Sequence, residues 1–215
     1  MMLYSTLLRA AEAEQTIERS RFIAYVQPVA DRLAADAFFE TIRSCHRDAR
    51  HCVPAFILGE KSETKWSSDD GEPQGTAGQP LLKLLEGEGL TFAAIMVVRY
   101  FGGIKLGPGG LSRAYSGTAR LAVDAAGRAQ AEELERLTIR VDYRIYERLN
   151  SVAKERQTTL DNPVFLEKVQ TDLLYPIEQA ETVEKWLNEE SAGQFENLGK
   201  QREISLRPVE IKLLL

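Results

Sequence analysis

The segment from Arg99 to Gly110 combines five glycines with basic residues, which is typical of loops that bind anions. It reads Arg-Tyr-Phe-Gly-Gly-Ile-Lys-Leu-Gly-Pro-Gly-Gly. Glycine lets the backbone turn sharply and approach a ligand without interference from a Cβ atom. A helix predicted to begin near Gly109 adds unpaired N–H groups and the positive end of its dipole. We therefore predict an anion or RNA site. Its predicted contacts are Arg99, Lys105, Gly109, Gly110, Arg113 and Arg120.

The basic character continues along that predicted helix. Arg113, Ser116 and Arg120 are spaced i, i+3 and i+7, so they share one helix face. The named phosphate motifs do not fit, because Pro108 stands where a Walker A loop needs Lys, and Ser112 stands where the dinucleotide pattern needs glycine. The alternative is that the glycines only connect a strand tightly to a helix and that the basic side chains are solvated.

A polar, Gly-rich stretch over residues 59–75 is predicted to be a long exposed loop, and such loops often carry function. Its carboxylates are the kind of group that holds magnesium or acts as a general base, although adjacent carboxylates in loops are also commonly only solvated. Thr76 and Gln79 have capping-box spacing, which predicts that a helix begins there. We predict that this region forms a second wall of the anion site. The residues of that wall are Asp69, Asp70, Glu72, Thr76 and His51.

Cys45, His46, His51 and Cys52 have residue types that suit zinc, but their spacing differs from that of a C-x-x-C knuckle. If the strand predicted over residues 51–58 includes Val53, His51 and Cys52 point to opposite faces and cannot share one metal. A site formed by Cys45 together with His51 remains sterically possible. We expect no metal and no cofactor, and the residues favour a binding module over an enzyme. Trp66 is either a stacking platform for a base or a partly buried anchor, and Trp186 is predicted to be in the core.

The elements that must position these residues follow from hydrophobic periodicity. Residues 16–28 suit a hairpin, and residues 31–45 suit a helix. Residues 51–58 are rich in β-forming residues and predict a strand, and the almost wholly apolar residues 92–98 predict a strand buried on both faces. A long Ala-rich helix is predicted over residues 111–126, ending at Gly127. The residues of the first helix predicted to face a sheet are Leu33, Ala37, Phe38, Ile42 and Cys45.

The second half of the chain has the order β-α-β-β-α-β, which is that of a ferredoxin-like domain. The strands are predicted over residues 137–143, 164–169, 171–177 and 203–207, and the helices over 146–157 and 178–190. A linker is predicted near residues 130–135. We therefore expect an α+β chain with two domains, at residues 1–132 and 133–215.

Composition excludes several classes of protein. The 215 residues carry a net charge of -5, and all of it falls on residues 131–215, because residues 1–130 hold 15 basic and 15 acidic side chains. Neither half is basic enough to bind nucleic acid by bulk charge, so any such binding needs a local patch. No run suits a membrane span or a signal peptide, and two cysteines cannot build a disulfide scaffold, so we expect a cytoplasmic protein with free thiols.

Three stretches in combination resemble the signature of the IMPACT/YigZ family. At residues 20–24, 69–78 and 97–107 they read Ser-Arg-Phe-Ile-Ala, Asp-Asp-Gly-Glu-Pro-Gln-Gly-Thr-Ala-Gly and Val-Val-Arg-Tyr-Phe-Gly-Gly-Ile-Lys-Leu-Gly. His46 and His51 also resemble the family's short His-containing segment. The match covers residues 15–127, and the second half resembles the C-terminal domain of the bacterial, two-domain branch.

The resemblance implies a ribosomal protein S5 domain-2-like first domain and an elongation factor G-like second domain. Eukaryotic members are translational regulators that compete for the ribosome-associated activator of a starvation-responsive kinase, a pathway that bacteria lack. The resemblance thus implies a role in translation or its stress response, by analogy of fold. Three hypotheses follow: a module that binds RNA or the ribosome, an enzyme or sensor for a small phosphorylated ligand or nucleotide, and a surface for a translation-associated protein.

Overall fold

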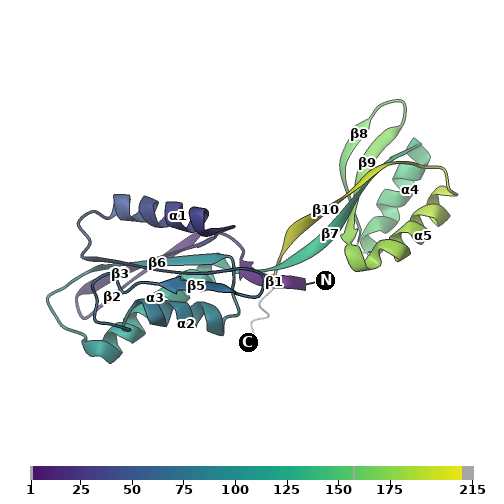
Figure 1. The fold of residues 1–215 in the computed structure, drawn as a ribbon. Helices are drawn as coiled ribbons and strands as arrows, with labels where there is room; N and C mark the ends of the chain where they lie inside the picture. The colour runs from purple at the N-terminus through teal and green to yellow at the C-terminus, as the bar shows by residue number, and fades with distance from the viewer. Residues whose placement is uncertain (1, 157, 210–215) are drawn as a thin grey trace, which may run out of the picture. The chain divides into compact units, whose positions relative to one another are not determined.

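A computed structural model describes residues 2–156 and 158–209, and these residues divide into two compact units. The N-terminal unit comprises residues 4–130 and 206–209, and the C-terminal unit comprises residues 2–3 and 131–205. Both units contain an antiparallel sheet with helices, so the predicted α+β class is confirmed (Figure 1). The division falls after residue 130, whereas the sequence placed it after residue 132.

The sheet of the N-terminal unit has the strand order β2-β3-β6-β4-β5, and every neighbouring pair is antiparallel. The predicted hairpin is present, and Glu18 and Arg19 form its turn with positive φ angles of 44° and 62°. Strand β6 lies in the middle and is buried on both faces, which explains its nearly continuous apolar sequence. The strands are β2 (Ala11–Ile17), β3 (Ser20–Pro28), β4 (His51–Leu58), β5 (Thr64–Ser67) and β6 (Ala93–Tyr100).

Helices cover both faces of this sheet, as Figure 1 shows. Helix α1 (Arg32–Cys45) covers one face, and α2 (Gly78–Gly87) and α3 (Gly107–Ala126) cover the other. Alternate residues of β6 therefore enter two separate cores: Met96 and Val98 meet the α1 side, and Ile95 and Val97 meet the α2 and α3 side. The outer strand β1 (Met2–Leu7) adds a parallel bridge from Ser5 to Leu90.

Several predicted details of this unit are wrong. Helix α1 buries Ala35, Phe39 and Ile42, while Leu33 is 79% exposed, so the predicted face is rotated about the helix axis. The predicted loop over residues 59–75 contains the short edge strand β5, on which Trp66 stacks against Phe56. Trp66 is therefore a partly buried anchor. Helix α3 begins at Gly107, so its glycines lie in the first helical turn.

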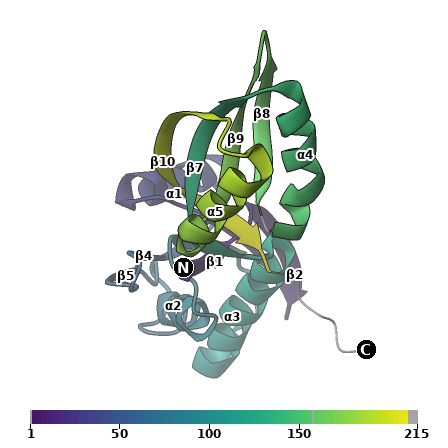
Figure 2. The ribbon, with the colours of Figure 1, turned by 90° about the vertical axis from the view of Figure 1, so that its right-hand side faces the viewer.

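The C-terminal unit follows the predicted element order. Its five-stranded sheet has the order β1-β7-β9-β8 with β10 also paired to β7, and α4 and α5 lie side by side on one face of it (Figure 2). Trp186 is buried, as predicted, with Val183 and Leu187. The elements are β7 (Arg128–Val141), α4 (Tyr143–Ala153), the 3-10 helix η1 (Lys154–Arg156), β8 (Thr159–Phe165), β9 (Val169–Pro176), the 3-10 helix η2 (Ile177–Gln179), α5 (Ala180–Ser191) and β10 (Glu196–Pro208).

The predicted linker at residues 130–135 is wrong, because these residues belong to the long strand β7. The strand predicted over residues 137–143 in fact begins at Arg128 and ends at Val141. Gln157, the predicted end of a helix, lies outside the described residues. None of the helices in the described part of the chain has the length and apolar character needed to cross a membrane.

Candidate anion-binding site

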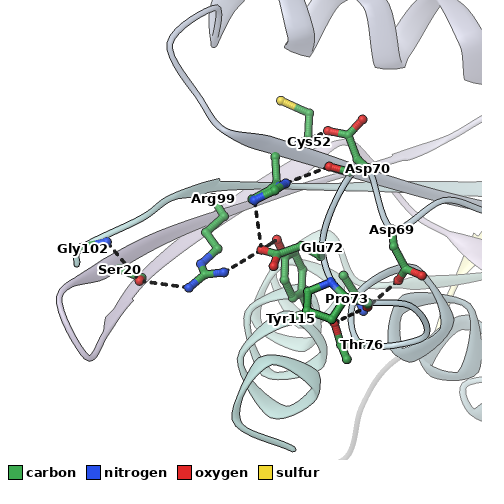
Figure 3. A network of polar contacts seen from close by, with 12 residues as sticks. Ser20, Cys52, Asp69, Asp70, Glu72, Pro73, Thr76, Arg99, Gly102 and Tyr115 are labelled. Atoms are coloured by element: carbon green, nitrogen blue, oxygen red, sulfur yellow. Dashed lines mark hydrogen bonds and ion pairs between the residues drawn. The ribbon is translucent and has the colours of Figure 1, made fainter. Parts of the chain in front are cut away.

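Two strand ends and one loop bring the site's polar side chains together. His51 opens β4, and Arg99 lies directly opposite it near the end of the central strand β6. The loop between β5 and α2 then places Glu72 against both residues, while α3 supplies Tyr115 from below (Figure 3). Residues far apart in sequence thus converge because antiparallel pairing aligns the ends of the two strands.

A buried ion pair forms the centre of the site. Arg99 Nη1 donates to Glu72 Oε1 over 2.7 Å, with side chains only 6% and 3% exposed. The hydroxyl of Tyr115 donates to the same Oε1 atom over 2.8 Å. Burial, followed by the charge of Glu72, raises the pKa of Tyr115, so this residue stays a hydrogen-bond donor. Ser20 Oγ accepts from Arg99 Nη2 at 3.4 Å and from the Gly102 amide at 3.2 Å.

Gly102 is required where the glycine segment crosses the β2–β3 turn. A Cβ atom at this position would lie 2.0 Å from the carbonyl oxygen of Arg19, far inside van der Waals contact. The glycine therefore lets β6 end directly against the hairpin that carries Ser20. This close approach is what joins the hydroxyl of Ser20 to the Gly102 amide.

The backbone holds the ring of His51 in one tautomer. His51 Nδ1 lies 2.7 Å from the carbonyl oxygen of Asp70, and because a carbonyl only accepts, Nδ1 carries the proton. In the neutral ring Nε2 is then a hydrogen-bond acceptor, 3.8 Å from Glu72 Oε1. As predicted, Cys52 faces away from His51: it lies in the core beneath α1, where burial raises the pKa of its thiol.

The two neighbouring aspartates have structural partners. Asp70 accepts from the Cys52 amide over 2.6 Å and from Arg43 over 3.1 Å. Asp69 accepts from the amides of Gly75, Ala77 and Gly78, so it caps the start of α2 from the loop. Burial works to raise the pKa of Asp69, but these three hydrogen bonds outweigh it, and the pKa lies below its ordinary value.

The predicted capping box is wrong. The hydroxyl of Thr76 donates to the carbonyl of Pro73 over 2.6 Å and does not cap α2. Asp69, several residues upstream in the loop, takes the place of the expected N-cap because its carboxylate reaches three amides at once.

A pocket of about 390 Å³ opens over the buried ion pair, and we call it the His51 pocket. Its lining combines the polar groups His51, Glu72 and Arg99 with the aromatic ring of Phe101 and the cation Lys105. The first turn of α3 closes one side, and no side chain in the described part of the chain caps this helix at its N-cap residue Leu106. The remaining lining residues are Arg50, Gly71, Pro73, Leu106, Gly107, Pro108 and Leu111.

Two further hollows of about 550 Å³ and 480 Å³ follow the exposed face of α3, and together we call them the α3 groove. Arg113 lines both hollows, and Lys105 lines both the second hollow and the His51 pocket. Arg113, Ser116 and Arg120 line the larger hollow together, so the shared face predicted for them is confirmed. Lys83 of α2 completes this wall.

The predicted site residues thus separate into three groups. Arg99, Lys105, Glu72 and His51 meet at the His51 pocket, whereas Gly110, Arg113 and Arg120 line the α3 groove. Gly109 lies between them in the first turn of α3. Asp69, Asp70 and Thr76 line neither and hold the loop in place. Two predicted phosphate contacts are already neutralised, since Arg99 pairs with Glu72 and Arg120 with Glu88.

Sequence reasoning missed four contributors: Arg50, Lys83, Phe101 and Tyr115. Phe101 lies inside the glycine-rich segment, and Arg50 is next to His51. Their positions in the sequence could therefore have identified both as site residues. Lys83 and the hydroxyl of Tyr115 reach the site only through the packing of α2 and α3. No group of three or more His, Cys, Asp or Glu side chains in the described part of the chain is arranged to hold a metal ion.

Comparison with known proteins places this site in a family. Residues 18–123 match the model of the Impact N-terminal domain. The chain is 32% identical to the IMPACT family member YvyE of Bacillus subtilis over 190 residues, which cover 88% of each chain. It is 40% identical to YigZ of Escherichia coli over 131 residues, 60% of this chain and 64% of that one. A crystal structure of a hypothetical protein matches 98% of both chains with a TM-score of 0.61 and 29% identity. The chain therefore belongs to the IMPACT family.

Proposed function

We propose that the N-terminal unit binds RNA, as free RNA or within the ribosome, and that the protein is a non-catalytic regulator of translation or of its stress response. One observation carries the proposal. Arg50, Lys83, Lys105 and Arg113 are all exposed along the His51 pocket and the α3 groove, and none has an ion-pair partner among the described residues. Unpaired cations arranged along continuous hollows suit a phosphate backbone.

The electrostatics of the lining support this proposal. Glu72, which is the one carboxylate among the described residues that line the His51 pocket, is neutralised by Arg99. The uncapped first turn of α3 adds amide N–H groups and a positive dipole end next to Lys105. A net charge of -5 for the whole chain does not oppose binding, because screening limits that charge to about 8–10 Å at physiological ionic strength.

The finer fold assignments belong to the same proposal. The C-terminal strand order β10-β7-β9-β8, with α4 and α5 on one face, supports a ferredoxin-like domain similar to those of elongation factor G. We propose an S5 domain-2-like fold for the N-terminal unit. Both expected folds occur in proteins of translation, and the cytoplasm is the compartment that this function requires.

Co-sedimentation with ribosomes and with free RNA across a salt series tests the proposal. Four phosphate contacts to a single strand give a slope of log K against log salt of about -2.8, and Lys105→Glu/Arg113→Glu reduces the slope to about -1.4. The matched control is Arg47→Glu/Lys61→Glu, which changes the net charge equally at exposed positions outside the pocket and the groove. Equal loss in both variants, or unchanged binding in the first, contradicts the proposed site.

A small phosphorylated ligand or nucleotide is the second candidate, with the protein as an enzyme or sensor. The polar groups of the His51 pocket favour it, because the neutral ring of His51 presents Nε2 as an acceptor in a pocket that Lys105 also lines. Asp69, Asp70 and Glu72 are the carboxylates that could hold magnesium or accept a proton in this candidate. Asp69 and Asp70 accept from backbone amides, and Glu72 pairs with Arg99. A thermal-shift screen separates this candidate, since a ligand at 100 times its Kd stabilises the fold by about 2.7 kcal/mol. Failure of both assays turns the search to a translation-associated protein.

A further inference from the structure

The His51 pocket contains an exposed aromatic ring, that of Phe101. Phe101 follows the last residue of β6 and is 42% exposed, although a phenylalanine gains most when it is buried. The guanidinium carbon of Arg99 lies 5.3 Å from the centre of its ring. Because a single cation covers only one face of a ring, the rest of Phe101 is open to the pocket that it lines.

Arg99 also contacts a second aromatic ring, which lies in the core. Its guanidinium carbon also lies 5.4 Å from the centre of the ring of Phe22, which is fully buried. Arg99 thus contacts one aromatic ring in the core and one at the pocket. The open part of the Phe101 ring can receive a planar group, and nucleobases bind to aromatic side chains in this way in single-stranded complexes.

Polar groups around the ring suit the rest of a nucleotide. The Nε atom of Arg99 is buried and has no hydrogen-bond partner among the described residues, and such a donor in a native structure calls for an explanation. Lys105 lines both the His51 pocket and the adjoining hollow of the α3 groove, so it stands where a strand would leave the pocket. The volume of about 390 Å³ lies within the usual range for small-ligand pockets, roughly 300–1,000 Å³.

We infer that the His51 pocket takes one unpaired nucleotide of a single-stranded RNA, with its base on Phe101 and its phosphate at Lys105. The neighbouring backbone then runs along the α3 groove past Arg113. This inference rests on the proposed function and narrows it, since a base inside a duplex is stacked between its neighbours and cannot enter the pocket. The protein therefore binds single-stranded RNA more tightly than duplex RNA. The cations of the pocket and the groove would by themselves bind both forms with similar affinity.

Fluorescence anisotropy with a labelled, unstructured 12-nucleotide RNA, and with the same RNA in a duplex, tests the inference on the full chain. Phe101→Ala is expected to weaken single-strand binding by about 5- to 150-fold, the measured range for the loss of one base–aromatic stack. Duplex binding is expected to change less than about twofold. Phe101→Trp retains a stacking surface and keeps single-strand affinity. Phe165→Ala, which removes another exposed phenylalanine in the C-terminal unit, leaves both unchanged.

The outcomes separate this inference from the proposed function. If Phe101→Ala binds the single strand like the unmodified chain while Lys105→Glu/Arg113→Glu loses it, the cationic surface stands and the nucleotide pocket is wrong. An equal loss of single-strand and duplex binding in Phe101→Ala also overturns the pocket. A free nucleoside monophosphate that binds as tightly as the 12-nucleotide RNA overturns it in favour of a small-ligand site. If the unmodified chain binds neither the 12-nucleotide RNA nor its duplex, the nucleotide pocket is wrong, and co-sedimentation with ribosomes decides the proposed function separately.

Discussion

Removing the charge of Glu72 is expected to destabilise the N-terminal unit by about 3–5 kcal/mol, the usual cost of breaking a buried ion pair. Glu72→Gln leaves the guanidinium of Arg99, which is only 6% exposed, without its anion. The same change weakens the acceptor of the Tyr115 hydroxyl. Since small domains are stable by only about 5–15 kcal/mol, this loss is a large fraction of the total.

A double-mutant cycle isolates the ion pair. Arg99→Met leaves the carboxylate of Glu72 buried with Tyr115 at 2.8 Å and His51 at 3.8 Å as its nearest partners, so it is also destabilising. The combination Glu72→Gln/Arg99→Met contains no unpaired buried charge. It is therefore expected to cost at least about 2 kcal/mol less than the sum of the single changes.

Urea denaturation measured by tryptophan fluorescence follows the N-terminal unit selectively. The chain has two tryptophans, and a Trp186→Phe background leaves Trp66, which stacks on Phe56 of the same sheet, as the single reporter. If Glu72→Gln costs less than about 1 kcal/mol, the ion pair does not stabilise the N-terminal unit as expected. The same holds if the cost of the double change equals the sum of the two single costs within about 0.5 kcal/mol.

Two further predictions concern the residues that hold the site in place. Asp69→Ala should cost about 1–2 kcal/mol, because the amides of Gly75, Ala77 and Gly78 lose their acceptor. Because folding lowers the pKa of Asp69, its ionised form stabilises the fold above its unfolded pKa of about 3.9, and this stabilisation is lost as pH falls through the folded value. Urea midpoints at pH 7 and pH 3 should therefore differ less in Asp69→Asn than in the unmodified chain, and an equal difference contradicts the capping role. Gly102→Ala should cost at least about 1–3 kcal/mol by thermal denaturation, because the new Cβ meets the Arg19 carbonyl at 2.0 Å. Gly87→Ala, with nothing within 4 Å, is the control and should stay within about 0.5 kcal/mol, so equal effects would reject the steric argument.

Local patterns in the sequence were sufficient where a residue's structure depends on its near neighbours. The strand at His51–Leu58, the α1 helix capped by Asp31 and the stop of α3 at Gly127 were all predicted at or within a residue or two of their bounds. Propensity, capping and glycine conformation act over a few residues, so a sequence window contains the information they need. The shared face of Arg113, Ser116 and Arg120 followed from helix geometry alone.

Predictions failed where a distant segment competes for the same group. Thr76 has the right spacing for a cap, yet Asp69 takes that role because the loop folds back over the start of α2. Strand β5 was missed because a short edge strand depends on its pairing with β4 more than on its own propensity. The face of α1 was misjudged because Leu33 and Phe39 are equally apolar in sequence, and the sheet decides which of them is buried.

By itself, the amino-acid sequence determined the α+β class, the order of strands and helices in the second half, the membership of the IMPACT family and the concentration of glycine and basic residues that points to an anion. The tertiary structure alone decided which charges are available. Arg99 and Lys105 are both basic residues of one short segment, but the buried Glu72 neutralises the first, and the second stays exposed beside a pocket. The strength of a charge depends on its burial and on the partners brought to it by long-range packing, and neither is encoded in any short stretch of sequence.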